Sequence, residues 1–300
     1  MKATTIDEVL SQLSRIIAES RQTGDRCGYF AALYYKVTAK VKEGIEKGQF
    51  EDGARMERLD VLFANRYLDA LASWKSGGEP SASWKIAFEA CGSRSVLVLQ
   101  HLLLGISAHI NFDLGIAAVE TMKGIGQDVA GREVGRDVAG REVGRDVAGR
   151  EVGQTVGAGQ TLQPIEKDFD SINIILGAMT YEVINEINRL SPMLSLIGKH
   201  SKNTESVLVQ FSMTNARDGA WCFAEDLFDL SGEAYQTCID ARDKDIAKLG
   251  STLVHFRAML RLTVWVIHLF ECKDPKRIIE VLQDYKKTFI HVSPVVAGSV

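Results

Sequence analysis

Apolar residues recur at spacings of three and four positions along most of the chain, which is the period of a helix with one buried face. In the first such stretch, Ile6, Val9 and Leu13 lie on a single stripe. The prolines fall between these stretches, and Asp274–Pro275 pairs a helix-capping residue with proline at a first helical position. No segment alternates convincingly between apolar and polar residues. The pattern predicts helices at 5–20, 27–46, 52–75, 82–91, 94–122, 165–190, 203–230, 233–248, 251–271 and 275–287.

The predicted fold is therefore all-α: a single domain over residues 1–290, with about ten helices around a central apolar helix at 94–122. Residues 291–300 form a tail. A low-complexity insertion interrupts the domain at 126–156, where GREVGRDVA recurs with a period of nine residues. The frequent glycines each weaken a helix by about 1 kcal/mol, and the repeats bury too little apolar surface for a solenoid. We expect a flexible or marginally helical connection on which the site does not depend.

Composition narrows the functional classes. The formal net charge is −4, whereas binding of duplex nucleic acid usually requires a basic face. The N-terminal sequence lacks the basic start and apolar core of a signal peptide. The cysteines are odd in number, widely spaced and without a C-x-x-C pair, which predicts neither a disulfide framework nor a cysteine zinc site (Cys27, Cys91, Cys222, Cys238 and Cys272). We expect a cytoplasmic protein that does not bind duplex nucleic acid.

The stretch from Val96 to Val119 is long enough to span a bilayer, and Asp113 is its only formally charged residue. Uncharged polar residues interrupt it, however, and neither flank carries a basic cluster or an aromatic belt. We interpret this stretch as the central helix of a soluble bundle and not as a membrane span.

The same helix carries the strongest candidate site. His109 and Asp113 are four residues apart, so their side chains point into the same space one turn apart. That spacing suits an imidazole nitrogen and a carboxylate oxygen on one divalent metal ion, zinc or iron. His101, about 80° away around the helix, is a candidate third ligand or supporting group, and Gly105 leaves room for another helix or a ligand. The alternative is a structural pair in which His109 donates a hydrogen bond to Asp113 without a metal.

Other helices could supply the remaining groups. Asp60 and Arg66 interrupt the apolar string ERLDVLFANRYLDAL. Asp170 and Asn173 share a face, and the isoleucines around them predict burial, whereas Asp168 is expected near the start of its helix. For each group the alternative is a solvated helix edge or a surface ion pair.

A last polar face lies at steps of four residues over Arg217, Trp221 and Glu225. Together these positions give one hypothesis for the division of roles. His109, Asp113, His101 and Asp60 would bind the metal, Asp170, Glu225 and Arg66 would act in catalysis, and Asn111, Asn173, Arg217 and Trp221 would bind the substrate.

The segments FANRYLDAL, ASWKIAFEA, LQHLLLGISAHINFDLGIA and DFDSINIIL together resemble domain-of-unknown-function family 5995. The likeness covers most of residues 1–290 apart from the insertion, and its most specific part is AHINFDL at 108–114. It implies an all-helical single domain and supplies no activity.

A second resemblance is local. LGISAHINFDLGIA is similar to the metal-binding helix of zinc-dependent phospholipase C and related single-strand nucleases, which hydrolyse phosphodiesters with a metal-bound hydroxide. This resemblance implies zinc ligands at His109 and Asp113 only. No second histidine occurs between Gly115 and Thr121, so it implies a site for one or two metal ions at most.

Three functional hypotheses remain. The leading one is a metal-dependent hydrolase acting on a small or lipid-like substrate such as a phosphodiester. The second is a non-hydrolytic, oxidase-like helical enzyme, although the paired Glu-x-x-His signature of di-iron bundles is absent. The third is a module that binds a small molecule or lipid, in which the histidine and aspartate form a structural hydrogen-bond network. The sequence predicts no oligomeric state.

Overall fold

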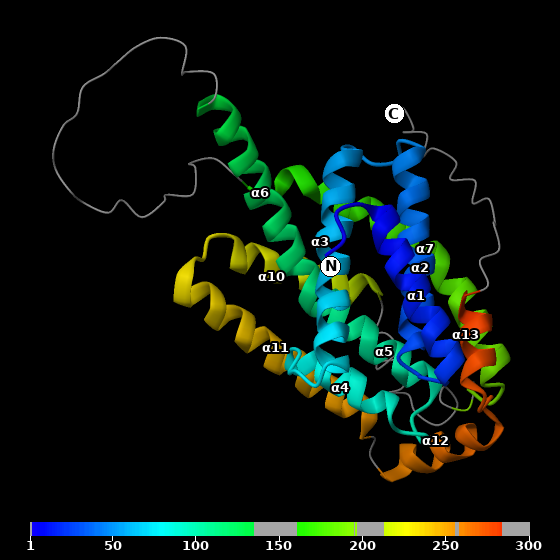
Figure 1. Cartoon of the computed structure of the whole chain (residues 1–300). Coiled ribbons are helices and arrows are strands. Elements are labelled where there is room, and N and C mark those ends of the chain that lie inside the picture. Colours follow the sequence, from blue (N-terminus) through cyan, green and yellow to red (C-terminus); the bar gives the residue numbers. More distant parts are fainter. Residues whose placement is uncertain (1, 135–160, 195, 197–212, 256–257, 284–300) are drawn as a thin grey trace, which may run out of the picture.

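The computed structural model describes residues 2–134, 161–194, 196, 213–255 and 258–283 (Figure 1). These residues form helices, turns and loops and contain no strand, so the predicted all-α class is confirmed. The elements are α1 (Ile6–Thr23), α2 (Gly28–Glu46), α3 (Gly53–Lys75), α4 (Ala82–Cys91), α5 (Val98–Ala108), the π-helical turn η1 (His109–Asp113), α6 (Leu114–Val134), α7 (Gln163–Leu190), α10 (Met213–Phe228), α11 (Gly232–Val254), α12 (Ala258–Phe270) and α13 (Pro275–Gln283).

Local sequence signals fix several helix ends. The side chains of Thr5, Asp52 and Ser81 cap α1, α3 and α4 by accepting a hydrogen bond from a backbone amide of the first turn. Gly24 ends α1 in the left-handed conformation with φ 75°. At Asp274–Pro275, the predicted junction, α13 begins with the proline at its first position.

The centre of the molecule is the continuous run of α5, η1 and α6. It contacts α2, α3 and α4 as well as α10 and α11, and Figure 1 shows α1, α2, α7 and α13 on one side of it and α10 and α11 on the other. Most of its side chains are buried up to Met122. The run is long and apolar enough to cross a membrane by length and composition, but 83% of its most apolar window is buried inside the protein. Its position therefore agrees with the predicted central helix.

The bounds of this central helix differ from the prediction of 94–122. Residues 94–97 precede the helix, which begins at Val98, and η1 interrupts it at His109. Beyond Met122 the helix continues to Val134, so the first residues of the predicted insertion are helical. The rest of the insertion, from 135 to 156, lies outside the described residues.

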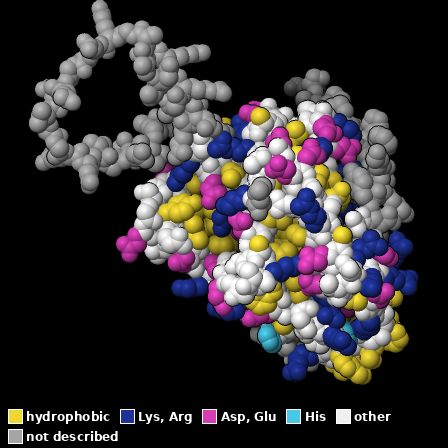
Figure 2. Space-filling model, in the orientation of Figure 1, with side chains coloured by type: hydrophobic (Ala, Val, Ile, Leu, Met, Phe, Trp, Pro, Cys, Tyr) yellow, Lys and Arg dark blue, Asp and Glu magenta, His cyan; other side chains and the backbone are white. Residues whose placement is uncertain are grey.

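One helix leaves apolar side chains outside the core. On α12, Leu262, Trp265, Leu269 and Phe270 are each more than half exposed, and apolar side chains gather at the corresponding edge of the surface (Figure 2). The neighbouring α13 instead buries Ile278, Ile279 and Leu282. The C-terminal helices therefore contribute to the core mainly through α13.

Candidate functional site

The predicted metal-binding pair lies where the central helix widens into η1. The Leu114 amide donates to the His109 carbonyl across this turn. Turns of this kind mostly occur as single interruptions of α-helices and are frequent at functional sites. His109 Nδ1 lies 3.3 Å from Asp113 Oδ2, so the sequence spacing does bring the two side chains together.

Asp113 is the centre of a four-residue network. Only 1% of the residue is exposed, and three donors surround its carboxylate. Arg66 Nε donates to Oδ1 at 2.9 Å, Trp84 Nε1 donates to Oδ2 at 2.8 Å, and His109 Nδ1 approaches Oδ2 from the same helix. A carboxylate accepts about four hydrogen bonds, so this buried charge is nearly satisfied by protein groups alone.

His109 is enclosed by aromatic rings. Its imidazole stacks on Phe63 with centroids 3.5 Å apart and packs edge-on against Tyr34 at 4.4 Å; the rings of Phe30, Tyr67 and Trp84 complete the enclosure. Burial lowers the pKa of His109, and the adjacent Asp113 opposes that shift. A neutral ring that donates to this carboxylate carries its proton on Nδ1. Its Nε2 has no hydrogen-bond partner among the described residues.

The two further metal-ligand candidates do not join this pair. His101 packs edge-on against Tyr29, and burial followed by the charge of Arg26 lowers its pKa to about 3. Burial raises the pKa of Asp60 to about 8, with a further contribution from Glu57. Within the described part of the chain, these four predicted ligands form no group of three whose ligand atoms lie within 4.8 Å of one another. The structure thus brings together His109 and Asp113 and leaves His101 and Asp60 apart.

This donor set fits a hydrogen-bonded network better than a divalent ion. Zinc would need coordinating oxygen and nitrogen atoms that point at one position. Here both Asp113 oxygens already accept hydrogen bonds, and the cationic Arg66 supplies the positive charge that an ion would bring. The metal assignment therefore stays a prediction for which the geometry offers two candidate ligands.

The predicted face on α10 separates into a buried and an exposed part. The Arg217 guanidinium is buried over the Phe169 ring, 4.7 Å from its centroid, and donates to the Phe169 carbonyl. Burial lowers the pKa of Arg217 to about 10. Trp221 Nε1 donates to the exposed Glu225 at 3.1 Å. None of these residues lines the cavities described below.

On α7 the expected burial of Asp170 is wrong, because its side chain is exposed. The buried acid is Asp168, near the helix start, which accepts from the Glu51 amide at 2.6 Å and from Arg55. The side chain of Asn173 lies outside the described residues. Asn111 is buried in η1 and donates to Ser107 at 3.4 Å.

A cavity of about 350 Å³ adjoins the Asp113 network, between α3, the start of α4 and α6. We call it the acidic cavity, because four carboxylates and two cationic groups line it. The carboxylates are Asp69, Glu79, Asp113 and Glu120, and the cationic groups are Lys2 and Arg66.

Most of these charges are paired. Lys2 lies 3.3 Å from Asp69, and Glu79 lies 2.8 Å from Lys85 outside the lining. Arg66 is shared between Asp113 and Glu120, whose Oε1 is 3.6 Å from Nη1. One negative charge, shared between Asp113 and Glu120, is therefore left over in the cavity. Apolar groups form the remaining wall, among them Leu62, Ala70, Pro80, Trp84 and Phe112.

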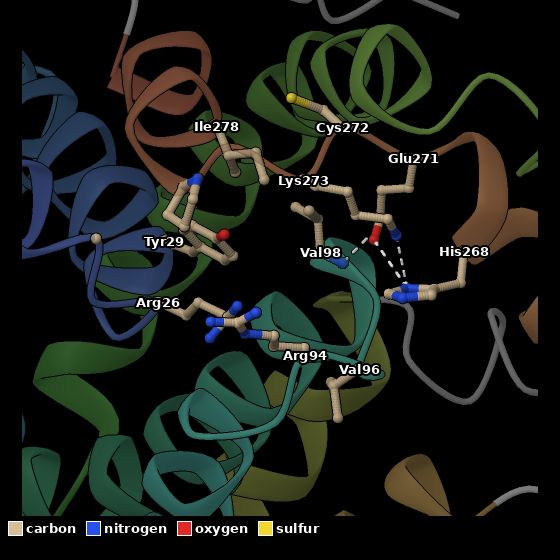
Figure 3. A pocket seen from close by; sticks show the side chains of 12 residues that line it. Arg26, Tyr29, Arg94, Val96, Val98, His268, Glu271, Cys272, Lys273 and Ile278 are labelled. Carbon is tan, nitrogen blue, oxygen red and sulfur yellow. Dashed lines mark hydrogen bonds and ion pairs between the residues drawn. The ribbon is translucent and has the colours of Figure 1, made fainter.

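A second cavity, of about 510 Å³, has the opposite charge (Figure 3). Arg26 and Arg94 both line this basic cavity, and Lys273 Nζ donates to His268 at 2.8 Å. Its one carboxylate, Glu271, is held by the Val98 amide at 3.1 Å and by the Ser191 hydroxyl. Tyr29 forms part of the wall. Since His101 packs against Tyr29, it lies behind this second cavity.

Sequence reasoning missed Trp84 and the partner of Arg66. A buried indole N–H needs an acceptor, so a tryptophan in the apolar helix ASWKIAFEA was a usable signal. The pairing of Arg66 with Asp113 spans 47 positions and depends on the packing of α3 against η1. No local pattern encodes such a pairing.

Comparison with known proteins identifies the family. The pattern of a family of unknown function (DUF5995) matches residues 6–137 and 147–256. The chain belongs to this family. The residues left between the two matches, 138–146, have the length of one nine-residue repeat. No curated protein and no solved structure matches the chain. The likeness to zinc-dependent phospholipase C finds no support in these comparisons.

Proposed function

We propose that this member of DUF5995 is a small-molecule-binding protein and that its acidic cavity binds an organic cation with an apolar portion. The observation that carries the proposal is the Asp113 network. A buried carboxylate, Asp113, is fixed by Arg66, Trp84 and His109 in the wall of a cavity whose lining retains one uncompensated negative charge, shared with Glu120.

The charge of the cavity favours a cation. A single cationic group, Arg66, faces two carboxylates, Asp113 and Glu120. The Glu120 side chain is 41% exposed. A ligand ammonium placed near Glu120 would balance the remaining charge, and complementarity of this kind selects between partners more than it raises affinity. An anion would instead meet unfavourable potential.

The size and the wall of the cavity favour a small, partly apolar ligand. A volume of about 350 Å³ lies at the lower end of the range for small-molecule sites, which combine apolar walls with a few fixed polar groups. Trp84 and Phe112 supply aromatic wall here. The Arg66 guanidinium already lies over the Phe112 ring, 5.8 Å from its centroid, so Phe112 contributes apolar contact and not a free face for a cation.

His109 has a supporting role in this proposal. The residue is 2% exposed and does not line the cavity, so it influences a ligand only through Asp113. By donating to Oδ2 it fixes the orientation of the carboxylate, and the surrounding aromatic rings fix the imidazole in turn. The arrangement corresponds to the third sequence hypothesis, a binding module with a structural His–Asp network.

A pair of matched probes tests the proposal. Phenethylammonium and 3-phenylpropionate have similar size and shape but opposite charge, and their binding can be measured by isothermal titration calorimetry. We expect the cation to bind more tightly, and Glu120→Gln to weaken it about fivefold, as for loss of roughly 1 kcal/mol from a partly exposed ion pair. Glu225→Gln, which removes an exposed carboxylate on α10 outside the cavity, should leave the affinity unchanged.

The outcomes separate the hypotheses. If the anion binds in the basic cavity, Glu120→Gln should not change its affinity. The variant therefore distinguishes binding in the basic cavity from binding in the acidic cavity. Equal affinity for both probes, unaffected by Glu120→Gln, would refute the proposal.

The hydrolase hypothesis is tested on the same preparations by metal analysis and by hydrolysis of bis(p-nitrophenyl) phosphate. Metal and activity that are both lost in His109→Ala and Asp113→Ala would favour it.

A further inference from the structure

Three potential metal ligands meet away from the Asp113 network. Asp25 and Cys27 lie in the turn between α1 and α2, and Cys91 is the last residue of α4. Their ligand atoms all lie within 4.8 Å of one another, and no other group of three such residues does so in the part of the chain that the structure describes. The wide sequence spacing of the cysteines predicted no cysteine zinc site, yet the fold brings two of them together.

Both segments are held in place by the backbone. The left-handed Gly24 ends α1, and the amides of Gly24 and Asp25 both donate to the Ser20 carbonyl. Asp25 Oδ1 accepts from the Cys27 amide at 3.0 Å, which fixes the carboxylate beside the Cys27 side chain. Arg26 Nη1 donates to the Cys91 carbonyl at 3.2 Å and so ties the turn to the end of α4. The three ligands are therefore positioned before any ion binds.

The chemistry of the three groups suits zinc. Zinc accepts thiolate sulfur at about 2.3 Å and carboxylate oxygen at about 2.0–2.2 Å in tetrahedral geometry, so two sulfurs on one ion lie about 3.8 Å apart. The adjacent Cys91 thiol and burial both raise the pKa of the Cys27 thiol well above its usual range. A divalent ion displaces the protons of its thiol ligands on binding.

The surroundings leave room for a fourth ligand. A cavity of about 500 Å³ is lined by Asp25, Cys27, Cys91 and Glu89, so water or the Glu89 carboxylate could complete the coordination. The cationic group in the same lining, Lys75, pairs with Glu19 at 3.0 Å, so Asp25 and Glu89 are the carboxylates beside the accessible position.

We propose that Asp25, Cys27 and Cys91 bind a zinc ion, with the fourth position open to the cavity beside Glu89. The site is separate from the His109–Asp113 network and does not depend on the proposed ligand of the acidic cavity. The competing use of the same two thiols is a disulfide. A disulfide would not account for the position of the Asp25 carboxylate or for the adjoining cavity.

Cobalt(II) is the spectroscopic probe for this site. Untagged protein is reduced, treated with a chelator and titrated with Co²⁺ alone, and Zn²⁺ is then added. We expect one equivalent of Co²⁺ to give thiolate-to-metal charge-transfer absorption, which Zn²⁺ abolishes. Cys27→Ser and Cys91→Ser should each lower the affinity by more than the roughly 10–100-fold that loss of an outer-shell partner costs. Asp25→Asn should weaken binding without removing the absorption.

Matched controls make each result decisive. Cys272→Ser and Cys222→Ser remove cysteines outside the cluster and should leave the titration unchanged, as should His109→Ala. Circular dichroism establishes that each variant is folded, and the half-buried Cys91 remains testable if Cys27→Ser does not fold. Absence of the absorption in reduced wild-type protein, or its survival in both Cys27→Ser and Cys91→Ser, would overturn the proposal. A Cys27–Cys91 disulfide in protein isolated without reductant, with no cobalt binding after reduction, would also overturn it.

Discussion

At the scale of single residues, the interior contains ionisable groups whose neighbours determine their state. The Asp113 carboxylate is surrounded by the donor groups of Arg66, Trp84 and His109. His101 has no such partner: neither ring nitrogen forms a hydrogen bond among the described residues, and burial with the charge of Arg26 lowers its pKa to about 3. Such a histidine is accommodated only in its neutral form.

The pH dependence of stability should therefore report His101. Its pKa is lower in the folded chain than the ordinary 6.5, so the unfolded chain binds more protons between these two values. Its contribution to stability is complete above pH 6.5 and is lost as the pH falls toward 3, at up to about 1.4 kcal/mol per unit. Between pH 6.5 and 4.5 the free energy of unfolding should fall about 2 kcal/mol more in wild type than in His101→Gln, as measured by urea denaturation.

Two features keep this measurement specific. The pKa of Asp60 is raised to about 8, so its contribution to the free energy of unfolding changes in the opposite direction and is lost as the pH rises from 3.8 to 8. Asp60 is present in both proteins, however, and its contribution cancels in the difference. His255→Gln changes an exposed histidine at the end of α11 and should follow the wild-type curve. If the free energy of unfolding depended on pH identically in wild type and His101→Gln, the His101 ring would not be buried away from solvent as described.

How far the sequence predicts the site depends on the range of each contact. The four-residue spacing of His109 and Asp113 correctly placed them together, because that contact lies within one turn. Long-range partners were not predictable. Arg66 was assigned to catalysis but pairs with Asp113 from another helix. Likewise, the isoleucines near Asp170 suggested burial, although the register of α7 buries Asp168 instead.

At the scale of elements, capping residues and apolar spacing predicted most of the helices. They did not predict η1, since a π-helical turn has no composition of its own and arises from packing between helices. Gly105 is an intermediate case. The sequence suggested that it leaves space for a neighbour, and the structure shows the ring of Phe30 from α2 in that space.

Gly105→Ala should therefore destabilise the protein. A Cβ at this position would lie 2.4 Å from Phe30 Cδ2, and that ring cannot easily move because it packs against Tyr67 and His109. Overpacking of this kind costs about 1–3 kcal/mol, which should outweigh the gain of up to about 1 kcal/mol in helix propensity. The measurement is the free energy of unfolding in urea.

The matched control is Gly250→Ala on α11, where the nearest atoms lie 3.4 Å from the added Cβ. It should be neutral or slightly stabilising, because the helix-propensity gain meets no severe overlap. If Gly105→Ala were as stable as Gly250→Ala, the close packing of α2 on α5 would be incorrect.

At the scale of the whole molecule, the C-terminal helices extend the fold beyond the family match. The match ends at residue 256, whereas α13 packs against α1, α2 and α7. Gly28, at the start of α2, lies directly against Ile279, and Arg21 pairs with Glu280. The family pattern alone would place the end of the domain too early, because the apolar face of α2 needs α13 to cover it.

A chain ending at residue 256 should therefore lose cooperative unfolding or aggregate. It would expose the surface that now buries Ile278, Ile279 and Leu282, and each such side chain contributes about 1.5–3 kcal/mol. In the full chain, Ile279→Ala should cost about 2–4 kcal/mol through the cavity it leaves. Leu262→Ala, on the exposed face of α12, should change stability by less than about 0.5 kcal/mol. Thermal and urea unfolding of the three proteins test this, and a shortened chain that unfolds like wild type would show that α13 adds nothing to the core.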